Sequence, residues 1–241
     1  MNVNKLDNQD LRYERKFHSG TVSPAQVEIF LKSNPLSFHK EFPDRMVNNI
    51  YLDTVHLDLH RYSIEGSPHR VKFRFRWYGD LLQEGATPVL EIKRKFGLVG
   101  DKLKWSLGKF DFNKEVSISN FTDQSIRDII SNQDVNDSFL ISSFDLRPVL
   151  VNRYQRRYYI SDDGRYRCTI DDSLTYYSIR SGKINVSSPI KNPSTIVEVK
   201  YHPKDEDGVT SLTSNLPIRL SKISKYTYGV NKLLTNRLFF T

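Results

Sequence analysis

The sequence predicts an α+β fold in which about eight antiparallel strands form a barrel with a cationic interior, flanked by helices. Three observations predict the fold class, and the barrel with a cationic interior rests on the charge pattern described below. Apolar and polar residues alternate along several segments, a pattern typical of strands that bury one face. Asp162-Asp163-Gly164 stands between two such segments and is a hairpin signal. Other segments have apolar residues at helical spacing and begin at recognisable capping residues.

The predicted elements start after a polar N-terminus. Residues 1–10 are predicted to form a flexible tail and residues 11–241 a single domain, because no linker composition interrupts them. After a strand at 11–18, Ser23 and Pro24 predict a helix that ends at Ser33, before Asn34-Pro35. Further strands are predicted at 47–52, 71–79, 88–96, 148–161, 165–174 and 195–202, with a glycine-rich turn at 97–100. Further helices are predicted after Asp53-Thr54 as far as 64, and around 123–131, 209–215 and 224–234.

Composition limits the class of partner. The 241 residues include 36 Lys and Arg against 28 Asp and Glu, a net charge of +8. This balance favours a polyanion such as nucleic acid, a nucleotide, polyphosphate or an anionic membrane surface. No apolar run approaches the roughly 20 residues of a spanning helix, so we expect no transmembrane segment; any membrane-protein partner is unknown. The single cysteine, Cys168, and the polar N-terminus predict a cytoplasmic location.

The charged residues of the predicted strands share one face in each strand. That face is dominated by lysine and arginine, with isolated carboxylates between them. These residues are Glu14, Lys16, Lys72, Arg74, Arg76, Glu91, Lys93, Lys95, Arg167, Asp171, Glu198 and Lys200. A solvated outer face would explain any one strand alone. Five such strands instead favour an anion site, because like charges in adjacent rows repel unless an anion lies between them.

The alternation also distinguishes among polyanions. Large aromatic side chains such as Phe73, Phe75 and Trp77 fall on the face opposite the cations. Proteins that bind single-stranded nucleic acid place aromatic rings beside the cations so that bases stack on them. We therefore expect phosphate groups rather than nucleic acid as the ligand. The carboxylates indicate a divalent metal that bridges Asp or Glu oxygens to phosphate oxygens.

Eight segments in this order resemble the VTC domain, the polyphosphate polymerase domain of the triphosphate tunnel metalloenzyme (CYTH-like) superfamily. The segments are RYERKF (12–17), NIYLDT (49–54), KFRFRWYG (72–79), LEIKRK (90–95), RYQR (153–156), RCTID (167–171), VEVKY (197–201) and SKISKY (221–226). The resemblance covers nearly all of the chain after residue 10. One departure is Arg12, where many tunnel enzymes have a first carboxylate in a Glu-x-Glu-x-Lys run.

The resemblance implies a barrel tunnel and a reaction. In that reaction the γ-phosphoryl group of ATP is transferred to a growing polyphosphate chain, with Mn²⁺ or Mg²⁺ as cofactor. The residues expected to be catalytic are Arg74, Arg76, Lys93, Arg156 and Lys225. Those expected to bind phosphate are Lys16, Lys72, Lys95, Arg167, Lys200 and Lys222. The expected metal ligands are Glu198, Glu91, Asp171 and Glu14.

Several alternatives stay open at the level of sequence. The function could also be that of an inorganic or nucleoside triphosphatase, or of a non-catalytic module that binds polyphosphate. The Glu-x-Lys pairs of three strands could be plain cross-strand ion pairs. Lys72 and Lys95 could lie solvated at the rim of the barrel, and Asp171 could serve only to orient Arg167.

Overall fold

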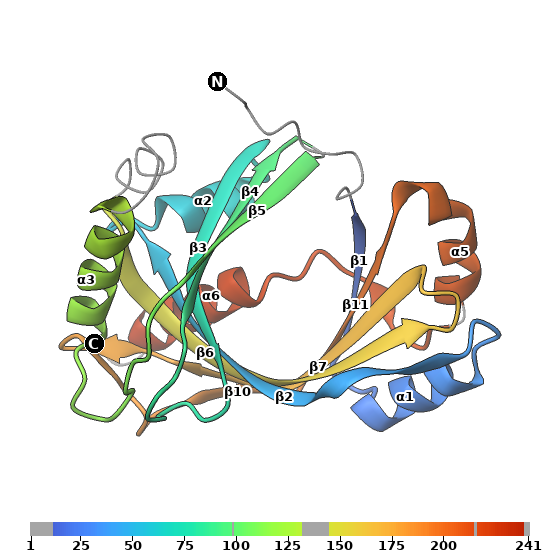
Figure 1. The fold of residues 1–241 in the computed structure, drawn as a ribbon, viewed down its shortest axis with the longest axis horizontal. Coiled ribbons are helices and arrows are strands. Elements are labelled where there is room, and N and C mark those ends of the chain that lie inside the picture. Colours follow the sequence, from blue (N-terminus) through green and yellow to red (C-terminus); the bar gives the residue numbers. More distant parts are fainter. Residues whose placement is uncertain (1–11, 98, 132–144, 215, 239–241) are drawn as a thin grey trace. The chain divides into compact units, whose positions relative to one another are not determined.

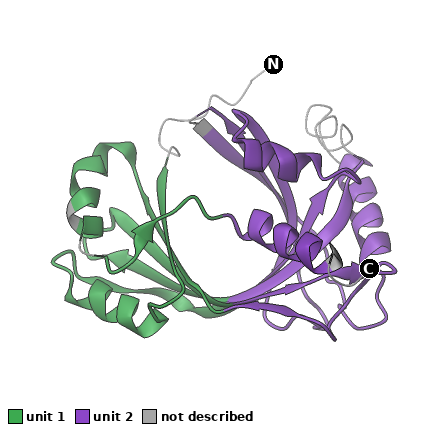
Figure 2. Cartoon of the chain, turned by 180° about the vertical axis from the view of Figure 1, so that it is seen from behind, with its two compact units in different colours: residues 1–45, 155–173, 193–223 green, residues 46–154, 174–192, 224–241 purple. Residues whose placement is uncertain are grey.

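The computed structural model describes residues 12–97, 99–131, 145–214 and 216–238. The tail predicted at 1–10 lies outside these residues. The chain divides into two compact units, each built from three stretches (Figure 2): residues 1–45, 155–173 and 193–223 form unit 1, and residues 46–154, 174–192 and 224–241 form unit 2. Three long strands, β2 (Phe38–Asp53), β6 (Arg147–Ser161) and β7 (Tyr166–Tyr177), contribute to both. The assignment of 11–241 to one domain stays a prediction.

Unit 1 is a sheet with helices packed on one face. Beside its parts of β2, β6 and β7 it contains β1 (Tyr13–Ser19), α1 (Pro24–Ser33), β11 (Thr195–Tyr201), η2 (Pro203–Asp205), α5 (Glu206–Ser214) and β12 (Arg219–Leu220). The strand order in this unit is β12-β1-β11-β7-β6-β2; Figure 1 shows the neighbours β1 and β11. Val27 and Leu31 of α1 and Val209 of α5 belong to one buried cluster with Ile170 and Val197 of the sheet. Polar residues lie on the opposite face of these strands.

Helix α1 begins and ends where the sequence predicts. The Ser23 side chain accepts a hydrogen bond from the Gln26 backbone N–H at 3.3 Å, and the Gln26 side chain accepts one from the Ser23 N–H at 2.8 Å. This reciprocal pair is a capping box. Pro24 occupies the first turn, and the C-cap is Asn34. Local capping chemistry therefore determines both ends.

Unit 2 contains the other strands of the same sheet and has its own core. Beside its parts of β2, β6 and β7 it contains α2 (Asp58–Glu65), β3 (His69–Tyr78), β4 (Val89–Phe96), β5 (Val99–Ser106), α3 (Ile118–Ser131), β8 (Ile179–Arg180), β9 (Lys183–Ile184), β10 (Ile190–Asn192) and α6 (Lys225–Leu238). Its strand order is β10-β7-β6-β2-β3-β4-β5. Phe73, Phe75 and Trp77 are completely buried, and the Trp77 ring stacks on Phe112 with 4.3 Å between ring centroids.

The α+β class with an antiparallel sheet is confirmed, with a difference in how the sheet is completed. Ten strands form one sheet, where about eight were predicted. Among the described residues the strand order is a path with β12 and β5 as its two ends, rather than the closed ring expected of a barrel. No described helix has the length and apolar character that crossing a membrane requires.

The short strands β8, β9, β10 and β12 were not predicted from the sequence, and three longer elements differ from the prediction. β2 begins at Phe38 rather than at 47. The sequence did not reveal this first part of the strand, because residues 39–45 are mostly exposed and show no alternation of apolar and polar residues. β5 continues beyond the turn predicted at 97–100, and its half-buried Leu103 and Trp105 alternate with exposed Lys102 and Lys104. α3 begins at Ile118 rather than near 123. Elsewhere the predicted elements are confirmed within a few residues.

Candidate functional site

The cations of β3 lie on the polar face of unit 2 because the other face is committed to the core. Phe73, Phe75 and Trp77 are buried, so the alternating Arg74 and Arg76 must point to the opposite side. Register extends this face across β4 and β5, where Lys72, Lys93 and Lys102 stand directly opposite one another in three adjacent strands. The cations on this face are Arg70, Lys72, Arg74, Arg76, Lys93, Lys95, Lys102 and Lys104.

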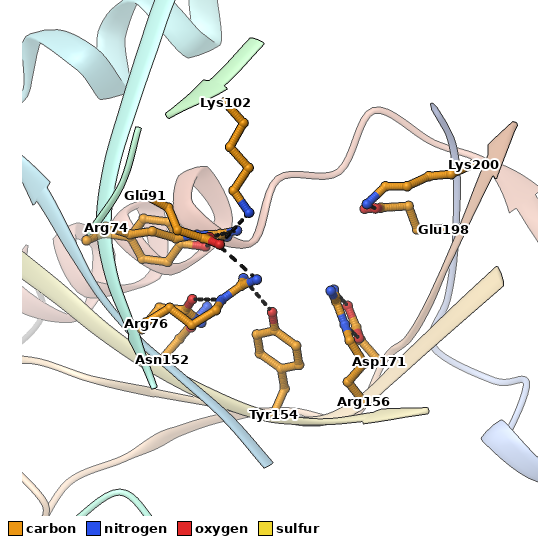
Figure 3. A network of polar contacts seen from close by, with 12 residues as sticks. Arg74, Arg76, Glu91, Lys102, Asn152, Tyr154, Arg156, Asp171, Glu198 and Lys200 are labelled. Atoms are coloured by element: carbon orange, nitrogen blue, oxygen red, sulfur yellow. Dashed lines mark hydrogen bonds and ion pairs between the residues drawn. The ribbon is translucent and has the colours of Figure 1, made fainter. Parts of the chain in front are cut away.

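One buried carboxylate lies among these cations. Glu91 is 6% exposed, and Arg74, Arg76 and Lys102 all point toward it (Figure 3). The Arg74 Nε and Nη2 atoms are 2.7 Å and 2.6 Å from Glu91 Oε2, and Arg76 Nη1 is 3.5 Å from the same oxygen. The Lys102 ammonium pairs with the other oxygen, Oε1. We call these four residues the unit 2 cluster.

The two arginines also have neutral partners. Arg76 donates from Nε to Asn49 Oδ1 at 2.9 Å and from Nη2 to the Tyr154 hydroxyl at 3.2 Å. Arg74 donates from Nη1 to the Tyr51 hydroxyl at 3.4 Å. The guanidinium groups are therefore held in place by hydrogen bonds as well as by charge. These two tyrosines do lie on the cationic face, where no aromatic ring was expected, but both are buried and so offer no platform for base stacking.

Electrostatics in the unit 2 cluster follows from crowding and burial. Burial alone would raise the pKa of Glu91, but Arg74, Arg76 and Lys102 outweigh it and hold that pKa far below its usual range. Burial would lower the pKa of Arg74, but the oxygens of Tyr51, Glu91 and Tyr154 raise it. The pKa of Lys102 is lowered to about 8: burial is the largest cause, the two arginines lower it too, and Glu91 opposes them. The cluster therefore has a net positive charge at neutral pH.

The first turn of α6 lies beside the same face of unit 2. Lys72 Nζ donates to Ser224 Oγ at 3.1 Å, immediately before the helix. The Lys225 ammonium lies 4.8 Å from the centroid of the Tyr154 ring, and Tyr154 in turn accepts a hydrogen bond from Arg76. Of the residues expected from the sequence, unit 2 thus brings together Lys72, Arg74, Arg76, Glu91, Lys93, Lys95 and Lys225.

Unit 1 has a different balance of charge on its polar face. Lys16 bridges two carboxylates, pairing closely with Glu14 and lying 3.6 Å from Glu198. Lys200 Nζ is 2.6 Å from the other oxygen of Glu198. Burial would raise the pKa of Glu198, but Lys200, Lys16 and Arg156 hold it well below its usual value. Here carboxylates and cations alternate, in contrast to the excess of cations in unit 2.

Asp171 is committed to an arginine. Arg156 donates from Nε to Oδ1 at 2.6 Å and from Nη2 to Oδ2 at 2.7 Å, and the Asp171 residue is completely buried. The alternative in which Asp171 orients Arg167 is not what this geometry supports, because Arg167 pairs at 2.9 Å with Glu41. Lys222 is exposed between β12 and α6. The other expected residues of unit 1 are Glu14, Lys16, Arg156, Arg167, Glu198 and Lys200, of which Arg167 is the most exposed.

A divalent cation suits the chemistry of Glu14 and Glu198. Both carboxylates are already close enough to share one ammonium group, and oxygen ligands are those that Mg²⁺ and Mn²⁺ prefer. Thr169, opposite Glu198 in the β7–β11 pair, has a buried hydroxyl oxygen without a hydrogen-bond partner among the described residues. The described residues contain no group of three His, Cys, Asp or Glu side chains placed to hold a metal. Any metal here would therefore take other ligands from water or phosphate.

Arg70, Lys102 and Lys104 are the cations of this face that sequence reasoning missed. Arg70 precedes the strand predicted at 71–79, and Lys102 and Lys104 lie in β5, where a turn at 97–100 but no strand was predicted. Leu103 and Trp105 between and after them carry the same alternation that revealed β3. That period-two pattern was the available signal. Tyr51 and Tyr154 had no such signal, because their place on the cationic face depends on the pairing of strands distant in sequence.

The fold and these two groups of residues define an α+β protein whose antiparallel sheet carries paired cations and carboxylates on its polar face. The chain belongs to the VTC domain family, whose model matches residues 11–234. This membership supports an activity on polyphosphate or triphosphate substrates. A comparison with curated proteins gave no significant match.

Solved structures give more distant similarities. The PH1819 protein of Pyrococcus horikoshii OT3 has a TM-score of 0.49 and 11% identity, over 91% of this chain and 99% of that one. A putative adenylate cyclase of Vibrio parahaemolyticus has a TM-score of 0.49 and 10% identity, over 93% and 97%. A putative adenylyl cyclase of Hippeastrum, described as having a dominant triphosphatase activity, has a TM-score of 0.49 and 17% identity, over 92% and 96%.

Proposed function

We propose that the protein is a metal-dependent polyphosphate polymerase that uses ATP. A terminal phosphate oxygen of the polyphosphate chain attacks the γ-phosphorus of ATP, the bond from that phosphorus to the β,γ-bridging oxygen breaks, and ADP leaves. Membership of the VTC domain family supports this reaction. The structural observation that carries the proposal is the polar face of β3, β4 and β5 in unit 2, where the described residues of these three strands place eight cations and one carboxylate, Glu91.

The proposed roles follow from the donors that each residue offers. Arg74 and Arg76 present forked guanidinium groups, which bind two oxygens of a phosphate at once. Phosphoryl transfer needs alignment and neutralisation of charge, and no nucleophile from the protein. We assign Lys93, Lys225 and Arg156 the role of neutralising further phosphate charge. The residues proposed to bind other phosphates are Lys16, Lys72, Lys95, Lys102, Arg167, Lys200 and Lys222.

Mn²⁺ or Mg²⁺ is the proposed cofactor, with Glu198 and Glu14 as its ligands. When bound, the metal supplies positive charge that stabilises the transferring phosphoryl group. Glu198 and Glu14 can exchange the shared Lys16 ammonium for a metal ion. We do not assign Glu91 and Asp171 to the metal, because arginines contact Glu91 Oε2 and both oxygens of Asp171 at 2.7 Å or less, whereas Glu198 and Glu14 pair with lysines.

The test is a product analysis with purified protein. ATP is incubated with Mn²⁺ or Mg²⁺, products are separated on a gel stained for polyphosphate, and ADP and orthophosphate are measured in parallel. The proposal expects polyphosphate and ADP, and neither product when EDTA is present. Orthophosphate from ATP or tripolyphosphate without any polymer would identify a triphosphatase instead. Binding of tripolyphosphate without turnover in either metal would identify a non-catalytic module.

A further inference from the structure

Glu91 is the only carboxylate on the cationic face of β3, β4 and β5, as the described residues define it. It is 6% exposed, accepts hydrogen bonds from Arg74 and Lys102, and forms an ion pair with Arg76 at 3.5 Å. A buried carboxylate with three cations around it has its oxygens occupied: Oε2 by the two guanidinium groups and Oε1 by the ammonium. A metal at Glu91 would have to displace these cations from both oxygens.

The arginines do not depend on Glu91 alone for their positions. Arg76 keeps Asn49 and the Tyr154 hydroxyl as partners at 2.9 Å and 3.2 Å, and the Asn49 amide is itself held by Asn152 at 2.8 Å. Arg74 keeps the Tyr51 hydroxyl. Neutral hydrogen bonds therefore place the guanidinium groups. What Glu91 adds is mainly negative charge.

That charge competes with any phosphate at the same donors. Arg74 uses Nε and Nη2 together on Glu91 Oε2, and these are the hydrogens that a forked contact with a phosphate also needs. A phosphate that enters must share or replace this contact. The competition lowers the affinity of each bound phosphate. A polymer that moves past a row of cations must bind strongly enough to enter and weakly enough to leave, as an ion does in a conducting channel.

We propose that Glu91 is a built-in counter-ion that limits the affinity of the unit 2 cluster for phosphate groups and so permits their release. The inference rests on the proposed function, in that it takes phosphate chains as the ligand. Glu91 acts on the phosphate indirectly, through its negative charge beside Arg74, Arg76 and Lys102. It predicts that removal of the charge strengthens phosphate binding, the opposite of what loss of a metal ligand or of a purely structural residue would do.

The experiment measures the binding of tripolyphosphate by calorimetry in EDTA, so that no metal takes part. Glu91→Gln removes the charge and keeps the shape, and we expect about tenfold tighter binding, as for one unit charge removed a few ångströms from the ligand. In turnover with ATP and Mn²⁺, both KM and kcat should fall, because release becomes slower. Glu91→Asp, which keeps the charge, should restore the affinity of the wild type to within about threefold.

Asp101→Asn is the matched control. Asp101 also forms an ion pair between β4 and β5, with Arg94 Nε at 2.7 Å, but on the opposite face from the cluster. The substitution changes the net charge by the same unit and removes a partner of arginine from the same two strands. We expect the affinity for tripolyphosphate to stay within about twofold of the wild type.

A second pair of variants keeps the inference testable if Glu91→Gln alone does not fold. Lys102→Gln should lower the affinity for tripolyphosphate. Adding Glu91→Gln restores the net charge of the wild type and removes the repulsion between the Glu91 carboxylate and the bound phosphate. The double variant should bind about tenfold more tightly than Lys102→Gln alone. Equal or weaker binding in either comparison overturns the inference. So does a loss of Mn²⁺ affinity in Glu91→Gln without phosphate present. A wild-type protein that binds no tripolyphosphate at all would instead contradict the proposed function.

Discussion

The hydroxyl of Tyr226 donates a hydrogen bond to Oδ2 of Asp53 and joins the first turn of α6 to the end of β2. Asp53 is completely buried and also accepts from the backbone N–H groups of Leu59 and His60, each at 2.9 Å, in the first turn of α2. One carboxylate thus links a strand and two helices of unit 2. The Tyr226 ring stacks on Tyr51 with 5.1 Å between centroids. This contact connects the arrangement to Arg74, the hydrogen-bond partner of Tyr51.

Tyr226→Phe is expected to lower the free energy of unfolding by about 1–3 kcal/mol, because it leaves a buried carboxylate without one of its donors. Denaturant unfolding followed by circular dichroism measures the change. Tyr228→Phe, two residues along the same helix, is the control and should cost less. Equal losses in the two variants would contradict the role given to the Asp53–Tyr226 pair.

Arg74→Gln and Arg76→Gln should each weaken the binding of tripolyphosphate about 10- to 100-fold, as expected for loss of a charge-assisted contact worth about 1.5–3 kcal/mol. The two should differ in stability. Arg76 is 7% exposed and has three partners, so its loss should also lower the melting temperature. Crowding of cations alone would suggest that these substitutions relieve repulsion in the empty site. We do not expect this, because Glu91 already neutralises part of that positive charge. Melting curves beside binding isotherms would show whether the two effects separate.

Glu198→Gln should weaken Mn²⁺ binding at least tenfold without a matching loss of tripolyphosphate binding in EDTA, since a neutral amide is a poorer ligand for a hard cation. Titration of free Mn²⁺ by electron paramagnetic resonance measures the first quantity. An unchanged Mn²⁺ titration would count against Glu198 as a ligand.

Asp171→Asn should behave differently from Glu198→Gln. The substitution leaves the Arg156 guanidinium without its paired charge in a buried place, which typically costs about 3–5 kcal/mol of folding free energy. We therefore expect a large drop in the denaturant midpoint and little change in Mn²⁺ affinity per folded molecule. The reverse outcome would assign Asp171 to the metal.

Phosphate binding should weaken as the pH rises through about 8, where Lys102 loses its proton in the folded protein. Because its pKa is lowered from 10.5 to about 8 on folding, the unfolded chain binds more protons between these values. The contribution of Lys102 to stability therefore increases with pH in that window. Calorimetry with tripolyphosphate from pH 7 to about 9.5 should show the loss of affinity in the wild type and a smaller one in Lys102→Gln. Titration of tripolyphosphate itself affects the wild type and Lys102→Gln equally. Parallel curves of affinity against pH for the two proteins would therefore rule out Lys102 as the titrating group.

Glu91 shows where prediction from the sequence stops. Its place on the same face as Lys93 follows from alternation along β4 alone. Its partners, however, come from β3 and β5, and the register between strands decides which side chains meet. A carboxylate among cations suggested a metal ligand, whereas the contacts identify three cationic partners. Glu198 is equally well paired, but it shares Lys16 with a second carboxylate, a relation that only the β1–β11 register creates.

The sequence by itself determined the faces of the strands, the capped ends of α1 and the family, because each depends on neighbours along the chain or on short segments in a set order. The tertiary structure alone decided that Lys102 joins the cluster, that Tyr51 and Tyr154 hold the arginines, and that cations prevail in unit 2 while carboxylates balance them in unit 1. The physical reason is that ion pairs and buried hydrogen bonds require separations of a few ångströms between residues that lie tens of positions apart. Strand pairing and register, which local patterns do not encode, produce those separations.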